Sequence, residues 1–183
     1  MQTKRSGESY AVALSQRPHD MILSRVDDRI IADVVRLAVS YPYPHSILGS
    51  PDAENYVHKL ANQARHEGDG LYALQYSDRV IAAAHLSVYG VGSGCEHTLW
   101  KIRHPLIAAG QPFEYLSNLF NMLTAVAVKL RAGTAKFVIF LSELEQEAIL
   151  QAQAAGFEPE ARFKDYYRLG EACFVYGKTI IGV

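Results

Sequence analysis

Seven histidines are the side chains best suited to acid–base chemistry or metal binding, because imidazole changes its charge near neutral pH and ligates transition metals. They are His19, His45, His58, His66, His85, His97 and His104. No two have the H-x-x-x-H spacing of a helical zinc site, and no cysteine and histidine cluster accompanies them. The pattern therefore predicts no metal site.

A glycine-rich stretch, 90–94, precedes the first of two cysteines, Cys95 and Cys173. It misses the phosphate-binding pattern G-x-G-x-x-G because Cys95 stands where the last glycine belongs. A turn is the better interpretation, since glycine is the default residue wherever positive φ is needed. For Cys95 the only adjacent base is His97, and we expect a structural thiol.

The segment 96–157 predicts a strand, a loop around Gly110, a long helix, a buried strand and a second helix. This order brings the start of a helix to the end of a strand. Free backbone N–H groups and the helix dipole favour an anion at such a junction. Phosphate binding at this loop is therefore one candidate function.

Composition limits the other function classes. The chain has 183 residues and a net charge of −1, which argues against a nucleic-acid partner. No apolar run approaches the ~20 residues of a membrane span, and the first 20 residues have no signal-type apolar core. Two cysteines without C-x-x-C spacing favour reduced thiols. We expect a cytoplasmic domain at 20–183 with a loosely docked extension at 1–19.

Four helices are expected from apolar spacing and start signals. Asp27 and Asp28 precede the first, which ends before the prolines of Tyr41–Pro44. Ser50 and Pro51 open the second. Phe113–Arg131 carries one apolar stripe, and Ser142 with Glu145 has capping-box spacing for the fourth.

The strands alternate with these helices. They are predicted at Met21–Val26, Leu71–Tyr76, Arg79–Tyr89, Glu96–Pro105, Phe137–Leu141, Ala161–Leu169 and Ala172–Lys178, and Tyr10–Leu14 is able to pair at an edge. The fold class is therefore α/β (α+β mixed sheet), with about six to seven strands and four helices. Its N-terminal part is antiparallel, and the Phe113–Arg131 helix makes a central parallel crossover.

The C-terminal third resembles a known superfamily. Residues 154–160 read Ala-Ala-Gly-Phe-Glu-Pro-Glu, and Asp165–Glu171 continues as Asp-Tyr-Tyr-Arg-Leu-Gly-Glu. A helix ending in Gly-Phe, followed by a strand rich in tyrosine and arginine, is similar to the GNAT superfamily of acyl-CoA-dependent N-acetyltransferases. The resemblance covers about residues 21–178.

The resemblance implies that the Glu96 and Phe137 strands splay apart and hold pantetheine between them, with pyrophosphate at the start of the long helix. Its implied cofactor-binding residues are Ile102, Arg103, His104, Ala108, Ala109, Gly110 and Gln111. The loop departs from the superfamily pattern. Ile107 replaces a basic or amide residue, and Pro112 replaces the second glycine. Arg103 and His104 then become the expected sources of positive charge.

The implied catalytic residues are Glu96, His97 and Tyr167. Members of the superfamily often place a carboxylate on the Glu96 strand as base, and a tyrosine acid four residues before the Gly-Phe glycine. That position is Ala152 here, so Tyr166 or Tyr167 is the expected replacement. The structural alternatives are a solvated strand end for Glu96 and His97, and ordinary sheet tyrosines for the other two.

Two functions remain open at this point. The first is an N-acyltransferase that moves an acetyl or other acyl group from acetyl-CoA, or from a carrier protein, to a primary amine of a small molecule or peptide. Aromatic residues of Tyr41–Pro44 are then able to line the acceptor site. The second is a binding or regulatory protein of the same shape without chemistry. The resemblance also implies a homodimer as one assembly.

Overall fold

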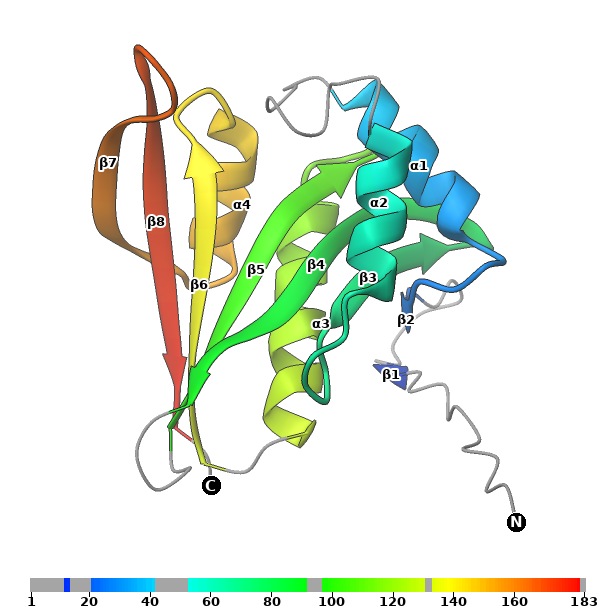
Figure 1. Cartoon of the computed structure of the whole chain (residues 1–183), viewed down its shortest axis with the longest axis horizontal. Helices are drawn as coiled ribbons and strands as arrows, with labels where there is room; N and C mark the ends of the chain where they lie inside the picture. The colour runs from blue at the N-terminus through cyan, green and yellow to red at the C-terminus, as the bar shows by residue number, and fades with distance from the viewer. Residues whose placement is uncertain (1–11, 14–20, 42–52, 92–96, 131–132, 182–183) are drawn as a thin grey trace.

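The structure contains one mixed sheet of eight strands, in the order β1-β2-β3-β4-β5-β6-β8-β7 (Figure 1). The computed structural model describes residues 12–13, 21–41, 53–91, 97–130 and 133–181. The strands are β1 (Val12–Ala13), β2 (Ile22–Arg25), β3 (Gly70–Tyr76), β4 (Arg79–Val91), β5 (His97–Ile107), β6 (Thr134–Ser142), β7 (Glu158–Arg168) and β8 (Glu171–Ile180). The helices are α1 (Ile31–Ser40), α2 (Ala53–Asn62), α3 (Glu114–Leu130) and α4 (Gln146–Ala154).

This architecture confirms the predicted fold class. Strands β1 to β5 pair antiparallel, and β5 and β6 are parallel neighbours joined through α3. The two-residue β1 falls within the segment expected to pair at an edge. The rest of the predicted 1–19 extension lies outside the described residues, so its loose docking stays a prediction.

The helices cover the two faces of the sheet unequally. Helices α1 and α2 pack over β3 and β4 on one face, and α3 and α4 pack on the other (Figure 1). The predicted stripe of α3 is buried, with Leu116, Leu119, Phe120 and Leu123 at 0% exposure. Phe120 meets Phe157 edge-on at 6.1 Å between ring centroids. The side of β6 and β8 opposite α3 and α4 has no covering helix in the described part of the chain.

A β-bulge interrupts the pairing of β4 with β5. His85 pairs with Arg103 and Ala83 with Leu106, so His104 and Pro105 together stand opposite one residue of β4. His104 has φ 51°, a left-handed conformation in which histidine is more frequent than most residues. Proline has no N–H to donate to a neighbouring strand. Bulges bend the strand that carries them, so β5 turns at this point.

The bend coincides with the end of the β5–β6 pairing. The last paired residues are Ile102 and Ile139. Beyond them β5 stays paired with β4 to Ile107, and β6 stays paired with β8 to Ser142. We call this unpaired part of the sheet the wedge. Its two strands diverge toward the end where α3 begins (Figure 1).

Local start and stop signals are confirmed in part. Ser77 and Asp78 form the predicted turn, with φ 49° and 61°. At the fourth helix, Oε2 of Glu145 accepts the Ser142 N–H at 2.7 Å, but the Ser142 hydroxyl accepts from Leu144 instead of Glu145. The helix therefore begins at Gln146, four residues after the expected cap. The Ser50–Pro51 start lies outside the described residues.

The first two residues of the glycine-rich turn expected at 90–94 belong to a strand instead. Gly90 and Val91 are the last two residues of β4, where they pair with Leu99 and Thr98. The β4–β5 pairing shifts its register between Val88 and Gly90, just before these two residues. Residues 92–96, including Cys95 and Glu96, lie outside the described part.

The bulge predicts a specific stability difference. We expect His104→Val to lower the free energy of unfolding by about 1–2 kcal/mol relative to His104→Asn, because a β-branched residue resists positive φ while asparagine tolerates it. Both variants lack the imidazole, so urea denaturation isolates the backbone effect. Equal stability of the two variants would contradict a left-handed residue at this position.

Candidate active site

The wedge leaves two strand edges without a strand partner among the described residues. Beyond Ile102 and Ile139, half of the backbone N–H and C=O groups of β5 and β6 point toward the opening. Backbone groups are obligatory hydrogen-bonding groups, so these edges suit an extended ligand that supplies amides of its own. The wedge is therefore the first element of a candidate site.

A tyrosine and a histidine meet beside the wedge. The Tyr56 hydroxyl of α2 lies 2.8 Å from Nε2 of His104, and the rings meet edge-on at 5.4 Å. Burial raises the pKa of Tyr56, so its hydroxyl stays protonated at neutral pH. The bulge thus turns His104 toward α2. Its predicted role was to supply charge to a phosphate at the start of α3.

On the other side of the wedge, a buried carboxylate links α1 to the β6–α4 connection. Glu145 is 0% exposed. Its Oε1 accepts from the Tyr41 hydroxyl at 3.0 Å, while Oε2 accepts from the Ser142 backbone. A buried carboxylate is tolerated only when such donors replace water. This contact joins residues 104 positions apart in the sequence.

Tyr167 is the inward member of the tyrosine pair on β7, as alternation requires. It is half-buried, and its oxygen accepts a weak hydrogen bond from the Cys173 thiol at 3.7 Å. Burial, and then the neighbouring Cys173, raise the pKa of Tyr167 far above its usual value, so the phenol stays neutral. Tyr166 is half-exposed and packs against Phe140. Ala152 is fully buried in α4.

His97 is not brought to this group. It is exposed at the first position of β5 and pairs with Thr134 at the closed end of the β5–β6 ladder. Five residues of extended strand, roughly 17 Å, separate it from Ile102. Glu96 lies outside the described residues. Catalytic roles for these two stay predictions.

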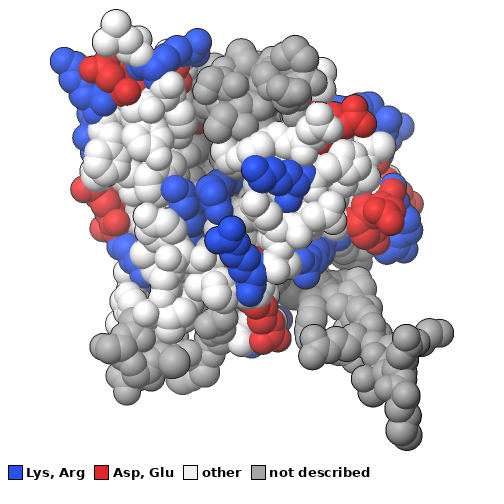
Figure 2. Space-filling model, viewed as in Figure 1, with Lys and Arg blue, Asp and Glu red and all other residues white. Residues whose placement is uncertain are grey.

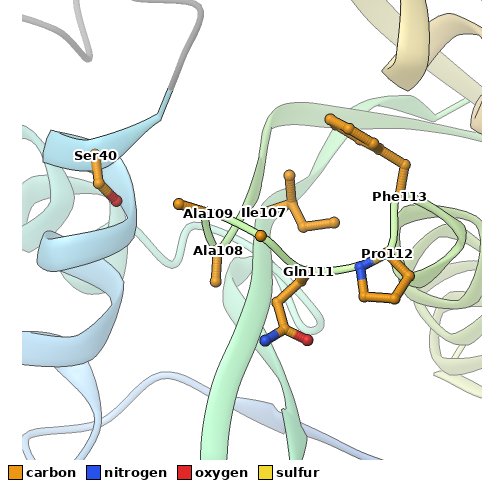
Figure 3. A pocket seen from close by; sticks show the side chains of 8 residues that line it. Ser40, Ile107, Ala108, Ala109, Gln111, Pro112 and Phe113 are labelled. Atoms are coloured by element: carbon orange, nitrogen blue, oxygen red, sulfur yellow. The ribbon is translucent and has the colours of Figure 1, made fainter.

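The loop between β5 and α3 borders an open pocket of about 480 Å³ (Figure 3). Ala108, Ala109, Gly110 and Gln111 line it together with Ser40 of α1. Gly110 has φ 76°, and the Gln111 N–H bonds to the Ala108 carbonyl at 3.1 Å. No acceptor within the described chain pairs with the N–H groups of Ala109 and Gly110. Four of the predicted cofactor-binding residues therefore lie together.

The other predicted cofactor-binding residues lie elsewhere. Ile102 is 0% exposed in the core, and Arg103 donates to the Ser87 hydroxyl across the β4–β5 ladder at 3.1 Å. Residues 107–113 carry no charged side chain, and Glu114 adds a carboxylate to the first turn of α3. The helix dipole and free amides favour a pyrophosphate here, while Glu114 opposes it.

Several site residues were not identified from the sequence. Tyr41 belongs to the predicted helix stop and Glu145 to the predicted capping box, while Tyr56 lies in the predicted second helix without a signal of its own. The capping signal did locate Glu145 beside Ser142. It carried no information about Tyr41, because that contact depends on where the end of α1 lies.

Metal and membrane sites receive no support from the described residues. No group of three or more histidine, cysteine, aspartate or glutamate side chains lies close enough to hold a metal ion in that part of the chain. None of its helices has the length and apolar character needed to cross a membrane.

Sequence comparison leaves the family open, whereas structural comparison identifies the fold. No protein-family model and no curated protein matches this sequence. Ribosomal-protein-alanine N-acetyltransferase from Brucella melitensis superposes with a TM-score of 0.66 at 13% identity, over 86% of this chain and 99% of that one. The fold is that of the GNAT superfamily.

Two further solved structures carry the same GNAT fold. An acetyltransferase of the GNAT family from Desulfovibrio desulfuricans matches with a TM-score of 0.60 at 20% identity, over 86% and 98% of the two chains. Arabidopsis thaliana Naa50, bound to the bisubstrate analogue CoA-Ac-MVNAL, matches with a TM-score of 0.58 at 18% identity, over 86% and 97%. These identities show the shared GNAT architecture, not a shared substrate.

The Tyr41–Glu145 contact of this GNAT fold generates a stability prediction. We expect Tyr41→Phe to lower the free energy of unfolding by about 1–3 kcal/mol, because a buried carboxylate loses a donor. Tyr176→Phe is the matched control, since Tyr176 is 5% exposed on β8 and no hydrogen bond of its hydroxyl is found in the described residues. Chemical denaturation of both variants measures the difference. Equal losses would contradict a contribution from the Tyr41 hydroxyl.

Buried His85 predicts a pH dependence. It is 2% exposed on β4, and burial, followed by Arg103, lowers its pKa from 6.5 to about 4. The unfolded chain therefore binds the proton first, and the stability that neutral His85 confers is lost as the pH falls from about 6.5 toward 4. The parent should lose free energy of unfolding when the pH falls from 7 to 5. We expect this loss to be smaller in His85→Leu, by up to about 2 kcal/mol.

Denaturation curves at the two pH values measure this difference. His58→Leu, at an exposed histidine of α2, is the control and should follow the parent. A His85→Leu variant with unchanged pH dependence would show that His85 titrates normally.

Proposed function

We propose that this protein is an N-acyltransferase that moves an acyl group from a thioester to a primary amine. The observation that carries the proposal is the wedge of a GNAT fold with the Tyr56–His104 pair on one side and Tyr167 on the other. Naa50, of the same fold, binds an analogue that joins CoA, an acetyl group and a peptide. This likeness supports a thioester donor and an amine acceptor.

The reaction needs two proton movements. The amine nitrogen attacks the thioester carbonyl, a C–N bond forms, and the C–S bond breaks. The nitrogen's proton passes to the Tyr56 oxygen while the Tyr56 proton passes to Nε2 of His104. Tyr167, kept neutral by burial, donates a hydrogen bond to the departing sulfur, which leaves as the thiolate. Positioning of both substrates in the wedge supplies much of the remaining rate.

Free strand edges stabilise the charge that develops on the carbonyl oxygen. In the transition state this oxygen becomes partly anionic, and backbone N–H groups aimed at it lower the barrier. The bulge at His104 changes the direction of the β5 backbone beside the opening. We assign the carbonyl oxygen to this part of β5.

The proposed donor is acetyl-CoA, without a metal. Two features also favour an acyl group on a carrier protein, which has no nucleotide pyrophosphate to bind. Residues 107–113 offer no basic side chain, and Glu114 adds a negative charge at the helix start. Isothermal titration with CoA separates the donors. Saturable binding supports the CoA form, and none at millimolar CoA leaves the carrier form.

A second candidate is a binding protein of GNAT shape without turnover. Ala152, fully buried where the superfamily's tyrosine is expected, favours this alternative. A screen of many amines with acetyl-CoA and with acyl-carrier donors distinguishes the enzyme from the binding protein. Turnover is measured as the release of free thiol. Absence of turnover with every donor would favour the binding protein.

Single substitutions test the assigned residues. We expect His104→Asn and Tyr167→Phe each to lower kcat by about 100-fold, the usual range for loss of a proton acceptor or of a hydrogen-bond donor to developing charge, while CoA affinity stays within about twofold. Asparagine keeps the left-handed backbone, so the bulge survives. Glu96→Gln and His97→Ala test the sequence-based prediction. If these variants lost more kcat than His104→Asn, the base would be assigned to Glu96 or His97 instead of His104.

A further inference from the structure

Two cations lie side by side on the face of β5 opposite α3. Lys101 and Arg103 are two residues apart on the strand, so both side chains project from the same face. The Lys101 ammonium lies 3.6 Å from the Phe140 ring centroid and 5.5 Å from that of Tyr89. Arg103 donates to Ser87, and its Nε is buried without a hydrogen-bond partner.

Neither cation has a carboxylate partner among the residues that the structure describes. The ion pairs found in the described residues involve other lysines and arginines. Both side chains are half-buried, so water compensates their charge only in part. Burial, and then Arg103, lower the pKa of Lys101, and Arg103 also helps keep the adjacent His85 neutral. The pair is an excess of positive charge that a bound anion would relieve.

The surface around the pair has the same sign. Figure 2 shows lysine and arginine side chains gathered across the middle of this face, over the central strands and α2, with acidic side chains mostly toward its margins. An anionic ligand approaching this face is therefore attracted, and a second ammonium group is repelled.

We propose that Lys101 and Arg103 form a subsite for a carboxylate carried by the acceptor amine. This inference rests on the proposed acyl transfer and narrows its acceptor to amino acids or other short amino carboxylates. Arg103 directly precedes His104, the proton acceptor of the proposed reaction. The carboxylate then lies about one or two residues of strand, roughly 3–7 Å, from the reacting nitrogen. Diamines and polyamines are excluded by their second positive charge.

Matched acceptors test the subsite. Amino acids are compared with their amides, which keep the amine and lack the negative charge. The binding affinity is measured by calorimetry, and acyl transfer is measured with the same compounds. We expect the carboxylate form to bind at least tenfold more tightly, with the difference reduced at high salt. Equal affinity of acid and amide would overturn the proposal.

Substitutions locate the preference on these two residues. We expect Lys101→Gln with Arg103→Gln to raise KM for the amino acid about tenfold or more, to leave KM for the amide unchanged, and to alter kcat little. Lys129→Gln, on the last turn of α3, is the matched control and should keep the preference. A double variant that still prefers the acid would overturn the assignment.

Two readouts separate this inference from the proposed function. If no donor is turned over, calorimetry still shows whether the acid binds in preference to the amide and whether the double variant loses that preference. Lys101→Met adds a readout on the free protein. We expect a higher midpoint of thermal unfolding, because the variant removes a half-buried charge that has no counter-ion. An unchanged or lower midpoint would contradict an uncompensated cation pair.

Discussion

The bulge at His104 and Pro105 is the constraint on which the rest of the site depends. One strand cannot stay in register with two neighbours when it gains a residue on one side, so β5 keeps β4 and leaves β6. The same backbone irregularity opens the wedge and directs His104 toward α2. A regular β5 would extend its pairing with β6 and close the space assigned to the thioester.

Charged groups of opposite sign flank the wedge. On the β6 side, a fully buried carboxylate fixes the end of α1 through Tyr41. On the β5 side, the cations of Lys101 and Arg103 have no carboxylate partner in the described residues. The first arrangement stabilises the fold. The second leaves electrostatic energy for a ligand to recover, which is characteristic of sites that bind charged substrates.

The β5–α3 loop and the wedge differ in how far they match the pattern that the GNAT resemblance implies. Gly110 keeps its positive φ, and free amides remain, but the loop has no cation and gains Glu114. The wedge, in contrast, keeps its divergence and has tyrosine hydroxyls on both sides. This asymmetry is why both a CoA donor and a carrier-borne donor enter the proposed function.

The sequence by itself determined the order of elements, the mixed sheet and the parallel crossover, because apolar periodicity, prolines and turn residues act over a few positions. Local alternation also required one of Tyr166 and Tyr167 to point inward, and the structure shows that it is Tyr167. Only the tertiary structure decided that His104 contacts Tyr56, that Glu145 contacts Tyr41, and that His97 lies at the closed end of the ladder. Those relations depend on strand register and on the packing of helices distant in sequence, which no local pattern encodes.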